Sequence, residues 1–250
     1  MQENQQEPKV ILYGGNGFVG TAIAEELVHQ GVAAVCVSRT GAMPVHLKDA
    51  EWAQQVAWIR GDALKSDLNL FDGATAVVTL IGSPPVPTFS KDAYAKQLAT
   101  NSEPNLAVIE ATGASPVKRL VVLGAHLPKV IRTDKFAYAK GKRLCYEAAQ
   151  QFAQVSEQHT AVVLQPTAIY GVRFDEDGKA TNVAAAMKPI ARLQSLLPSS
   201  VSRYLPETLV SVRAVANAAV NACLNLEYLG KFSEISNQQI LDQSTESNKT

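Results

Sequence analysis

Short apolar segments rich in β-branched residues alternate along this chain with longer segments of helical periodicity. Such alternation builds βαβ units, because parallel neighbouring strands need a crossover that usually contains a helix. The expected strands are Lys9–Tyr13, Ala33–Ser38, Val56–Arg60, Ala76–Ile81, Arg119–Leu123, Ala161–Gln165 and a short late one near Phe232–Ile235, and the expected helices are Phe18–His29, Lys91–Thr112, Ala137–Glu157, Val183–Leu196 and Val212–Leu226. The alternation predicts an α/β fold with a doubly wound parallel sheet.

The domain organisation follows from the same alternation, which loses its regularity only in about the last third of the chain. We expect a single domain over residues 9–242, with cap elements from about 172 to 210 over the carboxyl edge of the sheet. Residues 1–8 and 243–250 are polar and without periodicity, so we expect them to be disordered tails. Ligands of a doubly wound sheet bind at its carboxyl edge.

Composition excludes several classes of function. The 23 basic and 23 acidic residues leave no net charge, and the absence of a basic stripe argues against nucleic acid as a partner. The three cysteines are scattered and the histidines lack metal-ligand spacing, so we expect a reducing compartment and no metal. Residues 1–8 lack a hydrophobic signal region, and no apolar run reaches the length of a membrane span. These features predict a cytoplasmic protein without a transmembrane segment.

A glycine-rich motif follows the first strand and opens the first helix, with the sequence Gly14-Gly15-Asn16-Gly17-Phe18-Val19-Gly20. Gly14 permits a tight turn, Gly17 removes a side chain where a phosphate must approach, and Gly20 lets helix and strand pack closely. The N–H groups and dipole of the helix then face the anion. A plain strand-to-helix turn would also use these glycines, but their position favours nucleotide binding by the segment that includes Asn16 and Phe18.

The second strand ends in Ser38-Arg39, where a protein that binds NAD would normally carry an acidic residue. A serine hydroxyl and a guanidinium both bind a 2′-phosphate, and no carboxylate repels it there. The strand end therefore favours NADP(H) over NAD(H), with a merely solvated Arg39 as the alternative.

Other candidate cofactor contacts follow the third and fourth strands. Asp62, next to Ala63, is placed to accept a hydrogen bond from an adenine amino group or, almost equally well, to cap a short helix. Ile81 and Gly82 form a small-residue exit that would let a nucleotide lie across the sheet. Asn101 lies inside the long helix that follows and is compatible with an exposed position.

Together with the segments Tyr138–Lys142 and Gln165–Gly171, these motifs resemble the short-chain dehydrogenase/reductase superfamily. More narrowly, they resemble its extended and atypical branch, which includes NAD-dependent epimerases and dehydratases and has the Rossmann-type fold. The resemblance implies that Tyr138 is the general acid/base and that Lys142 assists it and holds the nicotinamide ribose. It also implies that Pro166 and Ile169 pass beside the nicotinamide, although a rigid strand exit would explain that segment equally well.

The chemistry of the tyrosine and the lysine is consistent with these roles. Residues at i and i+4 share a helix face, so the ammonium of Lys142 is expected near the phenol of Tyr138 and to lower its pKa. A surface helix with solvated lysines is the alternative.

One departure from the family pattern concerns a serine that usually follows the fifth strand. This chain has Gly124-Ala125-His126 there, and His126 either supplies the missing hydrogen bond or is a loop residue without a role. Members of the atypical branch that have lost catalytic residues are similar to the chain too. They include the nucleotide-binding accessory subunit of respiratory complex I and a related protein of ubiquinone biosynthesis.

The sequence therefore predicts an NADP(H)-binding oxidoreductase-like protein that acts on a carbonyl or hydroxyl carbon of a small molecule whose identity the sequence does not indicate. The alternative is a non-catalytic NADPH-binding protein that assembles, or senses the state of, a respiratory or quinone-biosynthesis complex. Both a homodimer and association with a larger complex are compatible with the sequence.

Overall fold

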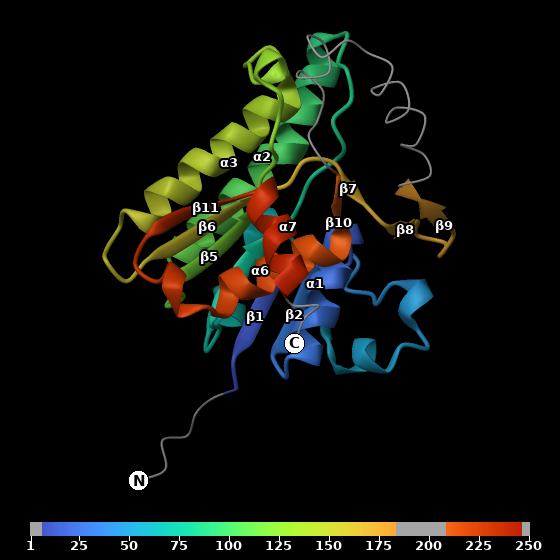
Figure 1. Cartoon of the computed structure of the whole chain (residues 1–250), viewed down its shortest axis with the longest axis vertical. Coiled ribbons are helices and arrows are strands. Elements are labelled where there is room, and N and C mark those ends of the chain that lie inside the picture. Colours follow the sequence, from blue (N-terminus) through green and yellow to red (C-terminus); the bar gives the residue numbers. More distant parts are fainter. Residues whose placement is uncertain (1–6, 184–208, 247–250) are drawn as a thin grey trace.

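The computed structural model describes residues 7–183 and 209–246, and its centre is a seven-stranded sheet (Figure 1). The strands are β1 (Lys9–Tyr13), β2 (Ala33–Ser38), β3 (Ala57–Arg60), β4 (Ala76–Thr79), β5 (Arg119–Leu123), β6 (Thr160–Gln165) and β11 (Phe232–Ser236), in the spatial order β11-β6-β5-β4-β1-β2-β3. Every neighbouring pair is parallel. Because the order reverses between β1 and β4, the predicted doubly wound sheet is confirmed.

Helices cover both faces of this sheet (Figure 1). They are α1 (Phe18–His29), α2 (Lys91–Gly113), α3 (Ala137–Ala153), α6 (Val212–Leu224) and α7 (Asn237–Glu246). Helix α1 packs against α6, and α2 packs against α3. Short 3-10 helices complete the connections, namely η1 (Val45–Leu47), η2 (Glu51–Gln55), η3 (Ala63–Lys65), η4 (Leu68–Phe71), η5 (Lys129–Ile131) and η6 (Leu226–Tyr228).

The central strand β1 shows why the strand sequences are continuously apolar. Val10 and Leu12 pack into the core cluster that contains α1 and α6, whereas Ile11 and Tyr13 pack into the cluster that contains Val108 of α2. All four strand side chains are fully buried. A strand with helices on both faces has no solvent side, so both of its alternating sets of side chains are hydrophobic.

Three predicted elements end earlier in the structure than in the sequence analysis, and one of them is helix α6, which ends at Leu224 rather than Leu226. Strand β4 ends at Thr79 rather than Ile81, because the side chain of Asn105 takes the backbone N–H and C=O of Ile81. Helix α3 ends at Ala153 rather than Glu157. The hydroxyl of Ser156 bonds to Nδ1 of His159 in a turn that leads directly into β6.

The C-terminal third contains elements that the sequence analysis missed. Strand β7 (Ile169–Tyr170) pairs with β10 (Val210–Ser211), and β8 (Val172–Phe174) forms a hairpin with β9 (Ala180–Asn182). Helix α7 runs to Glu246 and buries Ile240, so it extends past residue 243, where the tail was expected to begin. Most of the predicted cap, including all but the first residue of the helix expected over 183–196, and residues 1–6 of the predicted N-terminal tail lie outside the described residues.

Candidate functional site

The loop between β1 and α1 crosses the carboxyl edge of the sheet in very little space. Gly14 has φ of +88°, and its N–H donates to the carbonyl of Val37 at 3.0 Å. A Cβ atom on Gly20 would lie 2.4 Å from the Gly14 carbonyl oxygen, and one on Gly15 would lie 2.5 Å from Sγ of Cys36. The tight turn expected at Gly14 and the close packing expected at Gly20 are therefore both present. The sequence analysis assigned no role to Gly15, which allows the loop to pass over β2.

The N-terminus of α1 is open to an anion. Gly17 is the N-cap residue, with extended backbone. No side chain of the described residues caps the helix, and the first turn of the helix contains no acidic residue. A Cβ atom on Gly17 would meet only the Gly14 carbonyl oxygen, at 3.3 Å, so packing within the protein does not require glycine here. Asn16 and Phe18 flank this position. Free N–H groups beside an exposed glycine fit the pyrophosphate of a dinucleotide.

The two residues at the end of β2 that are expected to recognise a 2′-phosphate, Ser38 and Arg39, differ in their contacts with the rest of the protein. Oγ of Ser38 accepts a hydrogen bond from the N–H of Gly41 at 3.1 Å, so it stabilises the turn after the strand. Arg39 is exposed and makes no hydrogen bond or ion pair with any residue in the described ranges. Its guanidinium is therefore available to a ligand phosphate.

Asp62 has the capping role that the sequence left open. Its carboxylate accepts a hydrogen bond from the N–H of Leu64 at 3.0 Å and so caps η3. Ala63 is buried in the core cluster beneath β1 rather than exposed at the sheet edge. Capping and burial account for both residues without a ligand.

Two buried asparagines of α2 hold the loop after β4. The side chain of Asn105 accepts from Thr79 Oγ1 at 2.6 Å and from the N–H of Ile81 at 3.2 Å, and it donates to the Ile81 carbonyl at 2.8 Å. Asn101 accepts from the N–H of Ser83 at 3.1 Å and donates to its hydroxyl at 3.0 Å. The expectation that Asn101 occupies an exposed position was wrong, because this side chain is fully buried.

The asparagines also explain the glycine at the next position of that loop. A Cβ atom on Gly82 would lie 2.7 Å from Oδ1 of Asn101 and 3.9 Å from Nζ of Lys142. The exit of β4 therefore lies directly beside the lysine of α3. The signal that the sequence analysis missed is the i, i+4 spacing of Asn101 and Asn105, which places both on the helix face that buries Val108.

Tyr138 and Lys142 lie together at the start of α3, as their spacing predicted. The ammonium of Lys142 is 5.8 Å from the centre of the Tyr138 ring and donates to the carbonyl of Leu123, the last residue of β5, at 2.7 Å. The Tyr138 hydroxyl makes no hydrogen bond within the described part of the chain. The pair thus stands at the carboxyl edge with a phenol free to bond a ligand oxygen.

Burial, rather than the neighbouring cation, governs the protonation of this pair. It raises the pKa of Tyr138 to about 12 and lowers the pKa of Lys142. The expectation that Lys142 lowers the pKa of the phenol is therefore wrong for this structure. The ammonium points to the Leu123 carbonyl, so desolvation of the phenolate outweighs its attraction to the lysine.

The segment after β5 contains no hydroxyl, and His126 does not replace it. The N–H of Gly124 donates to the Leu164 carbonyl at 2.8 Å, and the N–H of His126 donates to the Pro166 carbonyl at 2.8 Å. These bonds tie the exits of β5 and β6 together. The imidazole of His126 makes no hydrogen bond to Tyr138 or to any other described residue.

The exit of β6 lies against the glycine loop. Gly171 has φ of +157°, and a Cβ atom there would lie 3.1 Å from the Phe18 ring. Thr167 donates its N–H to Oδ1 of Asn237, the first residue of α7, at 3.0 Å. The carbonyl of Pro166 accepts the hydrogen bond from the N–H of His126, and Ile169 packs against the main core cluster. The segment expected beside the nicotinamide therefore does lie at the shared edge.

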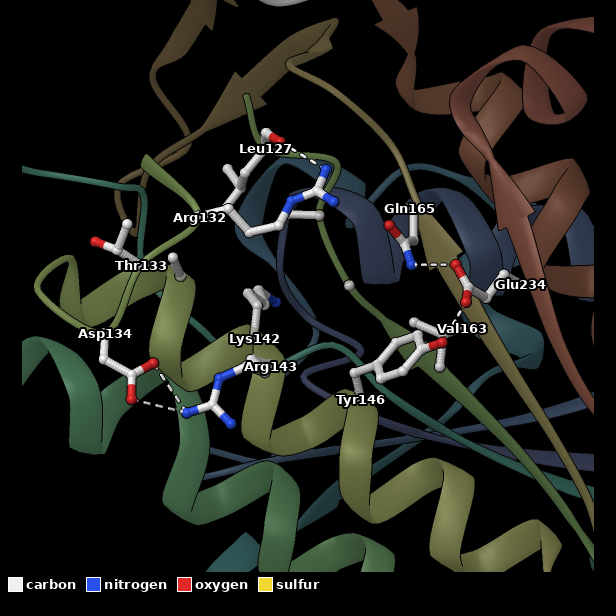
Figure 2. Close-up of a pocket in the computed structure, with 13 residues that line it drawn as sticks. Leu127, Arg132, Thr133, Asp134, Lys142, Arg143, Tyr146, Val163, Gln165 and Glu234 are labelled. Carbon is white, nitrogen blue, oxygen red and sulfur yellow. Dashed lines mark hydrogen bonds and ion pairs between the residues drawn. The ribbon is translucent and has the colours of Figure 1, made fainter. Parts of the chain in front are cut away.

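A cavity of about 270 Å³ adjoins Lys142 between α3, β6 and β11 (Figure 2). On one side the Tyr146 hydroxyl donates to Glu234, and Nε2 of Gln165 donates to the other carboxylate oxygen at 2.6 Å. Burial and the carboxylate raise the pKa of Tyr146 to about 12. On the opposite side Arg143 binds Asp134 at 2.9 Å and Glu147 at 2.6 Å. The remaining lining residues are Gly124, Ala125, Leu127, Arg132, Thr133, Ala139 and Val163.

A second cavity, of about 250 Å³, lies beside the glycine loop. His46 and Phe174 line it and stack with their ring centres 3.9 Å apart and their planes 8° apart. The stack joins the loop after β2 to the hairpin of β8 and β9. Burial lowers the pKa of His46.

Residues 7–183 and 209–246 contain no group of three or more His, Cys, Asp or Glu side chains arranged to hold a metal ion. None of the helices formed by these residues is long and apolar enough to cross a membrane.

Comparisons with known proteins agree with this geometry. Residues 10–202 match the NAD dependent epimerase/dehydratase family. The uncharacterized chloroplastic protein At1g32220 of Arabidopsis thaliana is 30% identical over 239 residues, which cover 90% of this chain and 74% of that protein. MIOREX complex component 2 of Saccharomyces cerevisiae is 43% identical over 79 residues, which cover 30% of this chain and 28% of that protein.

Among solved structures, an oxidoreductase of the short chain dehydrogenase/reductase family from Burkholderia thailandensis superposes with a TM-score of 0.67. The two are 16% identical, and the match covers 98% of this chain and 97% of the other. At this level of identity the match shows a shared fold.

Proposed function

Since the chain belongs to the NAD dependent epimerase/dehydratase family, we propose that it is an NADP(H)-binding oxidoreductase that acts on a carbonyl or hydroxyl carbon of a small molecule. The observation that carries the proposal is the position of Tyr138 and Lys142. The phenol is free of hydrogen bonds within the described residues, and the ammonium lies 5.8 Å from its ring at the carboxyl end of β5. The glycine loop, the β4 exit and the β6 exit meet the same edge.

The residues present fit a dinucleotide. The open N-terminus of α1 at Gly17 would hold the pyrophosphate, Arg39 the 2′-phosphate and Lys142 the nicotinamide ribose. When bound, the cofactor supplies or accepts the hydride. The protein's own contribution is to orient the substrate oxygen and to move one proton.

Tyr138 is the group that moves this proton. With a pKa of about 12 its phenol is protonated at neutral pH, so it donates to the oxygen of a carbonyl as that carbon is reduced. In the opposite direction the phenolate oxygen accepts the hydroxyl proton, and a closer approach of the Lys142 ammonium would stabilise that phenolate. The first direction needs no change in pKa, so we expect reduction to be the faster direction at neutral pH.

Cofactor choice is tested by titration with NADPH and NADH. Arg39 has no carboxylate partner among the described residues, so its bond to a 2′-phosphate would not compete with an ion pair. Losing such a charged hydrogen bond typically costs about 1.5–3 kcal/mol, which is roughly a 10- to 100-fold change in Kd. We expect Arg39→Gln to weaken NADPH by that factor and NADH by less than about twofold. Equal losses for both cofactors would contradict the proposed NADP(H) preference.

Catalysis is tested by oxidation of NADPH with a panel of carbonyl compounds and quinones. Tyr138→Phe removes the proton donor and should abolish turnover while NADPH binding is kept. Tyr228→Phe is the matched control, because its hydroxyl bonds to Gln243 in the C-terminal region. Turnover that survives in Tyr138→Phe would exclude Tyr138 as the acid.

A second candidate function is a non-catalytic NADPH-binding assembly or sensor protein of a respiratory or quinone-biosynthesis complex. Two observations favour it, namely the absence of a hydroxyl after β5 and the local similarity to a protein described as a MIOREX complex component. Tight NADPH binding without turnover, together with co-purification of the chain in a large complex, would support it over the enzyme. The cytoplasmic location stays a prediction, and the Arabidopsis thaliana relative is described as chloroplastic.

A further inference from the structure

The cavity between α3, β6 and β11 is lined by three cationic side chains and two carboxylates. Of its three cationic side chains, Arg143 is held by Asp134 and Glu147. Arg132 and Lys142 have no carboxylate partner within residues 7–183 and 209–246, and each donates instead to a backbone carbonyl. A guanidinium has five N–H donors, and that of Arg132 uses one of them, on the carbonyl of Leu127 at 2.9 Å.

The carboxylate of Glu234 keeps its charge, but its oxygens already accept hydrogen bonds from the protein. Both carboxylate oxygens of Glu234 accept hydrogen bonds, one from Tyr146 and the other from Gln165. Because its Nε2 points to Glu234, the amide of Gln165 keeps its carbonyl oxygen available as an acceptor. Figure 2 shows this hydrogen-bonded chain on one side of the cavity and the Arg143–Asp134 pair on the other. The cavity therefore offers two cations to an anion and an amide acceptor to a hydroxyl.

The volume limits the size of the ligand. The cavity has a volume of about 270 Å³. It lies just under the usual range of small-molecule sites, which is about 300–1,000 Å³. The cavity therefore suits a small ligand with one anionic group and one or more hydroxyls.

We propose that this cavity binds the anionic end of a small hydroxylated substrate, a phosphate or carboxylate held by Arg132 and Lys142 with a hydroxyl on Gln165. Its assignment as the substrate site rests on the proposed function, because Lys142 would then bring the ligand next to Tyr138. The binding of an anion in the cavity does not depend on that function.

The experiment is calorimetric titration of the whole chain with glycerol 3-phosphate, D-glycerate and neutral glycerol, with and without saturating NADPH. We expect at least one of the two anions to bind and glycerol not to bind, and the comparison of the anions identifies the preferred group. Arg132→Gln should weaken the anion about tenfold or more and Arg132→Lys by less, because the charge is kept. Lys129→Gln, which removes an exposed cation between β5 and α3 that does not line the cavity, should change the affinity less than twofold.

Several results would overturn the proposal. They are the absence of binding of either anion up to 10 mM, equal affinity in wild type and Arg132→Gln, and an equal loss in Lys129→Gln. Arg132 is exposed, so a folding defect is not expected, and a thermal melt of each variant verifies this. NADPH binding without anion binding would reject only this inference, whereas anion binding without NADPH binding would reject the proposed function and leave the anion site.

Discussion

Gly20 and Gly17 belong to one motif, but the structure predicts different consequences of replacing them. A Cβ atom on Gly20 would lie 2.4 Å from the Gly14 carbonyl oxygen and 2.6 Å from Cα of Gly15, both backbone atoms. No side-chain rotation relieves these contacts, so α1 or the loop must move by about 1 Å. Overpacking of this kind typically costs about 1–3 kcal/mol.

The expected size of the effect follows from this cost. For a chain of this length 1 kcal/mol lowers Tm by about 2–4 °C, so Gly20→Ala should lower Tm by about 2–12 °C. Gly17→Ala should cost less than about 1 kcal/mol, because the residue has extended φ and a Cβ atom there meets a single oxygen at 3.3 Å.

Nucleotide affinity separates the two variants further. A methyl group on Gly17 would occupy the space beside the open N-terminus of α1, so Gly17→Ala should weaken NADPH at least about tenfold, or 1.4 kcal/mol. Gly20→Ala should weaken NADPH as well, because it displaces the same N–H groups. The assays are thermal unfolding by circular dichroism and NADPH titration by fluorescence.

Two outcomes would contradict these expectations for Gly20 and Gly17. If Gly20→Ala melts within about 1 °C of the wild type, the close contact does not set the packing of α1. If Gly17→Ala binds NADPH as well as the wild type does, the glycine loop is not the phosphate site. Gly31→Ala controls for the substitution itself, since its φ of +71° strains alanine but no atom lies within 4 Å of the added Cβ.

Three further predictions concern single side chains. Asn105→Ala leaves the part-buried backbone groups of Ile81 without their side-chain partner and should cost about 1–3 kcal/mol in chemical unfolding, and a loss below 1 kcal/mol would contradict this. Asp62→Ala should cost about 1 kcal/mol of stability and leave NADPH affinity unchanged, as should Asp67→Ala, which removes an equivalent cap. A loss of NADPH affinity in Asp62→Ala alone would show that Asp62 contacts the adenine instead. Burial lowers the pKa of His46 in the folded chain below its unfolded value, so the unfolded chain takes up the proton first and stability falls as the pH drops through about 6.5. Tm should therefore fall more between pH 7.5 and pH 5 in the wild type than in His46→Phe. Equal falls in the two proteins would refute the lowered pKa of His46.

Local sequence was sufficient for most of the sheet. Strands β1, β2 and β5 and helix α1 have the predicted bounds, because each combines strong periodicity with clear ends. Boundaries shifted where a side chain from elsewhere intervened, as Asn105 does at the end of β4. Helix α7 was missed because its polar sequence hides one buried residue, Ile240.

In the candidate site, too, the features that depend on neighbouring residues were predictable and those that depend on distant residues were not. The turn at Gly14, the packing at Gly20 and the proximity of Tyr138 to Lys142 were predictable, since each depends on residues within one turn of the chain or helix. The hydrogen-bond partner of Asn101 was not predictable, because it is a loop 18 residues away in the sequence.

What the sequence by itself determined is therefore the α/β alternation, the glycine turn and the spacing of the tyrosine and lysine. Tertiary structure alone decided how those groups are charged and what surrounds them. Burial at the β5 exit raises the pKa of Tyr138 and lowers that of Lys142. The meeting of α3 with β6 and β11 creates the cavity, two of whose cations have no carboxylate partner among the described residues. Desolvation and cavity shape depend on atoms brought together from distant parts of the chain, and local sequence patterns do not encode them.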